Sequence, residues 1–163
     1  MKAVGIISEY NPFHEGHAYH IEQAKKLSGA DFAVVIMNGD FVQRGEPAII
    51  DKYTRTTQAL RGGADLVFEL PVRFGISSAG DFAYGGILAL EKLGFVDSVC
   101  FGSECGDLTL LEKVADILHD EPSDFKFFLS LVASTSAIAY CVPALFFTGI
   151  PSRSPSPSRS PRT

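Results

Sequence analysis

The chain has 163 residues, of which 46% are hydrophobic, enough to bury one core and form one globular domain. Its 14 basic and 19 acidic residues give a net charge of -5, which excludes a nucleic-acid-binding surface across the whole protein and leaves room only for a local basic patch. Three cysteines without a CxxC pair exclude a disulfide scaffold or a zinc ribbon and favour the reducing cytoplasm.

Short apolar runs alternate with amphipathic stretches along residues 3–119. The first run carries a single preceding lysine, so it predicts a strand and not a signal peptide. In chain order the pattern predicts a strand over 3–8, a helix over 17–27, a strand over 32–37, a helix over 52–61, a strand over 65–70, a helix over 81–93, a strand over 98–101 and a helix over 108–119. This alternation predicts a Rossmann-like, doubly wound α/β domain with a parallel sheet.

The stretch SEYNPFHEGHAYH, residues 8–20, follows the first predicted strand and contains three of the four histidines. Sheets of this class bind ligands beyond the carboxyl ends of their strands, where the strand order reverses. Asn11 and Pro12 end the strand, and His17 begins a helix whose free amides and dipole favour an anion. Gly16 lets the backbone approach a ligand closely. A phosphate group is therefore expected here.

His14 and His17, which flank the glycine, are the candidate catalytic residues. Each can donate a hydrogen bond to a phosphoryl oxygen and stabilise the negative charge that develops on a leaving pyrophosphate. His20 is interpreted as a supporting residue. No metal site is predicted, because no cysteine or carboxylate completes a ligand set and Tyr19 stands where the second histidine of an HExxH motif would fall.

A second polar segment, GDFVQRGEPAIIDKYTR, follows the strand predicted over residues 32–37. Loops at this edge of a sheet commonly carry function. Arg44 and Lys52 are the candidate substrate contacts, because they would attract a carboxylate or a phosphate. The alternative is that they form surface salt bridges with Glu46 and Asp51. The polar residues expected to gather at this edge are Gln43, Arg44, Asp51, Lys52 and Arg55.

The FGSE sequence ends the fourth predicted strand, which is expected beside the first. Gly102 in this sequence would let an adenine or a ribose lie against the backbone. Cys100 is interpreted as a core residue and not as a nucleophile, since nothing at its spacing offers a base.

The HxGH pattern from His14 to His17 resembles the signature of the nucleotidylyltransferase superfamily, Rossmann-like enzymes that attack the α-phosphate of ATP and release pyrophosphate. Four blocks narrow the resemblance, namely GIISEYNPFHEGHAYHI, MNGDFVQRGEPAIIDKYTRTTQAL, GADLVFELPV and FGSE. In this order they resemble the N-terminal part of the bacterial tRNA(Met) cytidine acetate ligase family over about residues 1–129. Members of that family activate acetate with ATP as acetyl-adenylate and pass the acetyl group to the N4 amine of the wobble cytidine in elongator tRNA(Met).

The resemblance implies an ATP site built from one continuous segment and one distant glycine. Magnesium is expected to be held largely by the ATP phosphates. The implied ATP-binding residues are Ile7, Ser8, Glu9, Tyr10, Asn11, Pro12, Phe13, His14, Glu15, Gly16, His17, Ala18, Tyr19, His20 and Gly102.

The composition changes after residue 129, the end of the predicted ATP-binding domain. Residues 130–150 are uncharged, and residues 151–163 contain only Pro, Ser, Arg and Thr and are expected to be disordered. Family members are longer and supply an ATP-contacting asparagine near position 152, where this chain reads Pro-Ser-Arg-Ser. We interpret this change as a shift of the reading frame near Ser130. The alternative, which we do not favour, is a membrane anchor over residues 127–150.

Three functions are compatible with these features. The first is the ATP-dependent acetate ligase that modifies tRNA in the cytoplasm. The second is a nucleotide-binding fragment without turnover, because residues 1–129 carry 11 basic and 19 acidic residues and are ill suited to hold an RNA backbone unaided. The third is an adenylyltransferase acting on a small phosphorylated acceptor, which shares HxGH but does not explain the QRGEP block.

Overall fold

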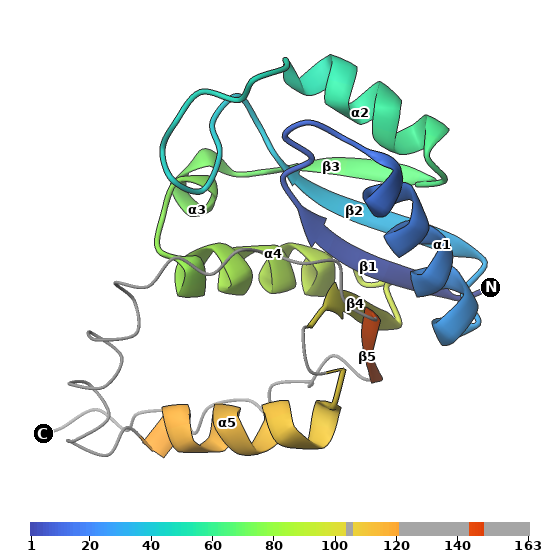
Figure 1. The fold of residues 1–163 in the computed structure, drawn as a ribbon, viewed down its shortest axis with the longest axis vertical. Coiled ribbons are helices and arrows are strands. Elements are labelled where there is room, and N and C mark those ends of the chain that lie inside the picture. The colour runs from blue at the N-terminus through green and yellow to red at the C-terminus, as the bar shows by residue number, and fades with distance from the viewer. Residues whose placement is uncertain (104–105, 121–143, 149–163) are drawn as a thin grey trace, which may run out of the picture.

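The computed structural model describes residues 1–103, 106–120 and 144–148 (Figure 1). The predicted frame shift near Ser130, most of the uncharged run and the tail over 151–163 lie outside the described residues. Within the described ranges, no helix is both long and apolar enough to cross a membrane. In chain order the elements are β1 (Ala3–Ser8), α1 (Glu15–Ser28), β2 (Phe32–Asn38), α2 (Lys52–Arg61), β3 (Leu66–Leu70), α3 (Val72–Gly75), α4 (Ala79–Leu93), β4 (Ser98–Gly102), α5 (Leu108–Asp120) and β5 (Ala144–Thr148).

The strands form one sheet in the order β3-β2-β1-β4-β5. β1 pairs in parallel with both β2 and β4, and β2 pairs in parallel with β3. The predicted Rossmann-like parallel sheet is thus confirmed for four strands. β5 pairs antiparallel with β4 at the edge, in the segment for which the sequence predicted no strand.

The sheet separates two apolar cores, one on each face. In the first, Ile21 and Ala24 of α1 and Ala59 of α2 pack on β1 and β2. In the second, Leu90 of α4 packs on alternate residues of the same strands, among them Val34. Figure 1 shows α1 and α2 on one side of the sheet and α4 on the other. Strands buried on both faces explain the nearly continuous apolar runs in the sequence.

Glycines allow α4 to lie close to the central strand. A Cβ atom at Gly86 of α4 would lie 2.6 Å from Ile7 Cδ1, and one at Gly5 of β1 would lie 2.6 Å from Leu90 Cδ1. Both distances are shorter than van der Waals contact, so a side chain at either position would push the helix away from β1. The end of β1, where the chain enters the histidine segment, is therefore held firmly between two layers.

Several boundaries differ from the predicted ones for local reasons. α1 begins at Glu15 and not at His17, because His14 occupies the N-cap position. α4 begins at Ala79 and not at residue 81, because the Ser78 side chain accepts a hydrogen bond from the Asp81 amide and caps the helix. The single turn α3 was not predicted, since four residues after a proline carry no helical periodicity.

Candidate nucleotide-binding site

The predicted segment lies at the point where the strand order reverses. The chain leaves β1 toward β2 and β3 and then returns to the other side of β1 to form β4. The carboxyl ends of β1 and β4, and the start of α1, therefore meet at one edge of the sheet (Figure 1). Gly102, the last residue of β4, is exposed, and nothing lies within 4 Å of the position that its Cβ would take. This is the crevice in which doubly wound sheets bind their ligands.

His14 and His17 form a stacked pair at the start of α1, with ring centroids 3.7 Å apart. Their hydrogen bonds are reciprocal: His14 Nδ1 accepts from the Gly16 amide at 3.1 Å, and His17 Nδ1 accepts from the His14 amide at 3.2 Å. Two histidines thus make the capping box that serine and glutamate usually make. Because each Nδ1 is an acceptor, each ring carries its proton on Nε2. Two N–H donors are therefore fixed side by side.

The environment keeps His17 uncharged at neutral pH. Burial, together with the smaller effect of the charges of His14 and His20, lowers the pKa of His17 from 6.5 to about 4. The His17 ring also packs against the rings of Tyr10 and Phe13, with centroids 4.8 and 5.5 Å away. The side chain is therefore a preorganised neutral donor, which can stabilise developing negative charge without first changing its protonation.

The low pKa of His17 predicts a loss of stability in acid. Between pH 6.5 and 4 the unfolded chain binds a proton at this residue that the folded chain does not, so the free energy of unfolding falls as the pH drops through this range. We expect the His17 ring resonances to titrate with a midpoint of about 4 by NMR. In His17→Asn, the fall in the urea-unfolding free energy from pH 6.5 to pH 4 should be smaller. A midpoint near 6.5 would contradict the assigned environment.

Gly16 lies against the ring of His14. A Cβ atom at Gly16 would lie 3.0 Å from His14 Cε1, so a side chain there would press on the ring. The sequence predicted that Gly16 and free helix amides would meet a phosphate. The amides of Gly16 and His17 instead bond to His14, to its Nδ1 and to its carbonyl. The imidazole Nε2–H groups, and not these amides, are what the helix start presents.

His20 connects α1 to β4. Its Nε2 lies 3.6 Å from Sγ of Cys100, a residue with 1% of its surface exposed. Burial lowers the pKa of His20 and raises that of Cys100 to about 11, so both groups are neutral at neutral pH. The prediction that Cys100 is a core residue is confirmed, and His20 is a base that the sequence spacing around Cys100 did not reveal. The thiol is still a poor nucleophile, because its thiolate is disfavoured.

The other residues of the implied ATP-binding segment divide into inward and outward ones. Tyr10 is 1% exposed, and its side chain packs in the core. Glu9 Oε1 accepts hydrogen bonds from Asn38 Nδ2 at 3.1 Å and from the Gln43 amide at 2.5 Å. Asn11 Oδ1 accepts from the Ile49 amide at 2.7 Å. The residues of the segment with exposed side chains are Pro12, His14, Glu15 and Tyr19.

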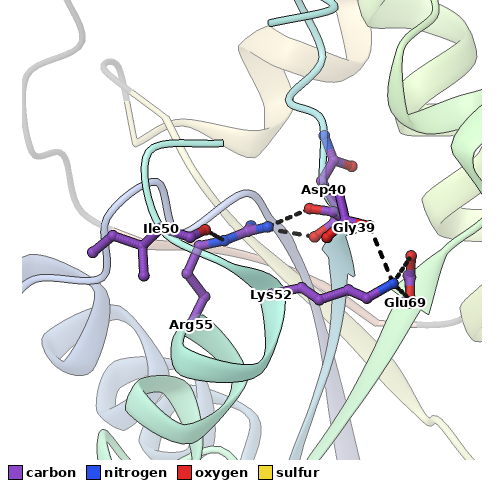
Figure 2. A network of polar contacts seen from close by, with 7 residues as sticks. Gly39, Asp40, Ile50, Lys52, Arg55 and Glu69 are labelled. Carbon is purple, nitrogen blue, oxygen red and sulfur yellow. Dashed lines mark hydrogen bonds and ion pairs between the residues drawn. The ribbon is translucent and has the colours of Figure 1, made fainter. Parts of the chain in front are cut away.

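Lys52 and Arg44, the predicted substrate contacts, have different surroundings. Lys52 Nζ lies 3.3 Å from Asp40 and 3.0 Å from Glu69, and hydrogen bonds to Glu69 raise its pKa (Figure 2). These partners differ from the predicted ones, because Asp51 instead caps α2 through the Thr54 amide. Arg44 is exposed at a turn closed by Gly45, whose φ is 80°. Of these two predicted contacts, only Arg44 therefore offers a positive charge that no carboxylate of the described residues pairs.

Arg55 is the residue whose role the sequence did not reveal. It was expected with the polar surface cluster, yet it is 0% exposed. Its Nε donates to the carbonyl of Ile50 at 2.8 Å, and its Nη1 donates to the carbonyls of Glu9 at 2.6 Å and Asn38 at 3.2 Å. Its Nη2 donates to the carbonyl of Gly39 (Figure 2). One feature of the sequence could have indicated that Arg55 is buried: it lies four residues before Ala59, the other buried residue of α2, and so on the same face of the helix.

Cavities lie beside this edge of the sheet. One of about 290 Å³ lies beneath α2 and is lined by Met37, Asn38, Lys52, Tyr53, Thr56, Val67 and Glu69. A hollow of about 600 Å³ between α1 and the end of α2 is lined by residues that include Tyr19 and Arg61. In the described part of the chain, no three His, Cys, Asp or Glu side chains lie close enough to hold a metal ion.

Comparison with known proteins matches residues 1–140 to the HIGH Nucleotidyl Transferase family. The chain is 55% identical over 129 residues to the tRNA(Met) cytidine acetate ligase of Acetivibrio thermocellus. The aligned residues make up 79% of this chain and 31% of that protein. It is 53% identical over 129 residues to the ligase of the same name from Halothermothrix orenii, with the same coverage of 79% and 31%. The chain thus spans about a third of the length of the curated relatives that it matches.

Two solved structures of Thermotoga maritima TmcAL share the fold. The form bound with alpha-thio ATP has a TM-score of 0.72 and 47% identity, over 82% of this chain and 32% of that chain. The apo form has a TM-score of 0.72 and 46% identity, over 83% and 33%. The resemblance that the four sequence blocks predicted is confirmed. With its match over residues 1–140, its parallel sheet and its paired histidines, the chain belongs to the HIGH nucleotidyl transferase family.

Proposed function

We propose that this chain carries the ATP-binding part of an ATP-dependent acetate ligase that modifies elongator tRNA(Met) in the cytoplasm. In this reaction acetate attacks the α-phosphate of ATP and pyrophosphate leaves; the N4 amine of the wobble cytidine then attacks the acetyl carbon of the acetyl-adenylate, and AMP leaves. The observation that carries the proposal is the stacked His14–His17 pair, whose two Nε2–H groups are fixed at the switch point of the sheet. The identity to relatives of that name supports it.

The proposed binding site is the segment from Ile7 to His20 together with Gly102. The adenosine would lie near the exposed backbone of Gly102, and the phosphates would lie at the Nε2–H groups of His14 and His17. Arg44 is the proposed contact for a carboxylate or phosphate of the substrates. Lys52 is the weaker of the two predicted contacts, because Asp40 and Glu69 already neutralise its charge. The proposed domain comprises residues 1–129.

A second candidate is nucleotide binding without turnover. It is favoured by the acidic balance of residues 1–129, because a tRNA backbone needs positive charge. In this case the chain would bind ATP at the same histidine pair, and the acceptor steps would need further segments.

Acetate-dependent exchange of pyrophosphate into ATP tests these candidates. We expect the complete chain, supplied with ATP, magnesium and labelled pyrophosphate, to return label to ATP only when acetate is present. Exchange that needs a small phosphorylated acceptor instead would support the adenylyltransferase. ATP binding without exchange would support the second candidate. The absence of both ATP binding and exchange would refute the proposed site.

A further inference from the structure

Arg55 ties together three chain segments at the edge of the sheet that carries the proposed site. Its guanidinium donates to the carbonyl of Glu9 after β1, to those of Asn38 and Gly39 at the end of β2, and to that of Ile50 before α2. No carboxylate forms an ion pair with it among the described residues, although Asp40 and Glu9 lie near enough to raise its pKa against the larger opposing effect of burial. Carbonyl oxygens alone therefore satisfy a fully buried cation.

The segments joined by Arg55 enclose the 39–50 loop, which runs from the end of β2 to the start of α2. This loop is bonded to the proposed nucleotide segment at two further points. The Gln43 amide donates to Glu9 Oε1 at 2.5 Å, and the Ile49 amide donates to Asn11 Oδ1 at 2.7 Å. Both ends of the loop are thus fixed to the residues that enter α1, and Arg44 lies between them.

We propose that Arg55 is a positioning residue of the ATP site, an inference that rests on the proposed function. By holding the Glu9 carbonyl against Gly39, it sets the distance between the segment that binds the nucleotide and the 39–50 loop that carries Arg44. Binding of ATP to the segment is thereby coupled to the order of the loop. Arg55 itself is buried and touches no substrate.

The role requires arginine and not only a positive charge. The planar guanidinium directs Nε and both Nη atoms at different carbonyls, as Figure 2 shows for Ile50 and Gly39. A lysine ammonium is a compact charge with three donors, and it cannot reach at once the carbonyls that are spread around the edge of the guanidinium. Arg55→Lys therefore keeps the charge and loses the geometry. Arg61, an exposed arginine at the end of the same helix, offers the matched control Arg61→Lys.

The test compares amide hydrogen exchange and nucleotide affinity in the complete chain. Without ligand, Arg55→Lys should speed exchange at the Gln43 and Ile49 amides by about tenfold or more. This factor corresponds to the free energy of one lost hydrogen bond to a charged group. The dissociation constant for alpha-thio ATP should rise by a similar factor of about ten, measured where both proteins are fully folded. Arg61→Lys should change neither quantity.

The two measurements separate the inference from the proposed function. If the wild-type chain binds no nucleotide, the proposed function fails, while exchange at the Gln43 and Ile49 amides still decides whether Arg55 positions the loop. The positioning role is refuted if Arg55→Lys folds and its Gln43 and Ile49 amide hydrogens exchange as slowly as those of Arg61→Lys. It is also refuted if Arg55→Lys folds and binds nucleotide as tightly as Arg61→Lys. If Arg55→Lys does not fold, the Arg55 Nε–H resonance of the wild-type protein replaces it: a shift on adding nucleotide supports the coupling, and an unchanged resonance overturns it.

Discussion

Replacing His17 with asparagine is expected to slow acetate-dependent pyrophosphate exchange by about 10²–10³-fold and to leave the fold intact. The asparagine Oδ1 lies near the position of His17 Nδ1 and can still accept the bond from the His14 amide, which is 3.2 Å long in the native chain. No asparagine atom reaches the position of Nε2. The variant therefore removes the proposed donor to the ATP phosphates and keeps the cap of α1.

The matched variant is His17→Gln, whose amide nitrogen reaches the Nε2 position but whose side chain leaves the His14 amide without its acceptor. We expect it to keep more of the exchange rate and to lose about 1 kcal/mol of stability through the lost cap. Should the chain bind ATP without turnover, the same order holds for the dissociation constant of alpha-thio ATP, with about a tenfold loss in His17→Asn. Full exchange or full affinity in His17→Asn would contradict the role of Nε2.

Replacing Arg55 with leucine is expected to lower the free energy of unfolding by about 3–5 kcal/mol. The change leaves the carbonyls of Glu9, Asn38, Gly39 and Ile50 without their donor, inside a site where the native side chain is 0% exposed. Because a domain of this size is stable by about 5–15 kcal/mol, the loss is a large share of the total.

Urea unfolding followed by circular dichroism measures this loss, and Arg61→Leu provides the control. Arg61 is exposed at the end of the same helix, so its replacement should alter the unfolding free energy by less than about 0.5 kcal/mol. A loss in Arg55→Leu as small as in the control would mean that water replaces the guanidinium at the four carbonyls.

The apolar runs of the sequence were sufficient to predict the central sheet. Residues such as Val34, Val35 and Ile36 are buried on both faces of β2, and this environment produces an unbroken apolar run. The expected place of β4 beside β1 is confirmed as well, and it agrees with the crossover connections usual in such sheets. The antiparallel pairing of β5 could not be predicted, since it depends on contacts with β4 across about 40 residues and not on a local pattern.

The histidine segment was predicted in its position but not in its internal bonding. That His14 would cap α1 through a ring nitrogen could not be foreseen, because histidine is not among the usual N-cap residues. Arg55 was misplaced for a different reason: a charged residue is expected at the surface, and only the four carbonyls supplied by three separate segments explain its burial. Both features depend on backbone geometry that residue types alone do not specify.

Titration of the labelled chain with alpha-thio ATP, followed by NMR, tests the proposed site most directly. Binding at the switch point of the sheet should shift the ring resonances of His14 and His17 and the amide of Gly102, and His17→Asn should weaken the binding. Shifts confined to the cavity of about 290 Å³ beneath α2, around Tyr53 and Thr56, would place the nucleotide elsewhere and contradict the assignment. The absence of any shift at saturating nucleotide would contradict nucleotide binding by this chain altogether.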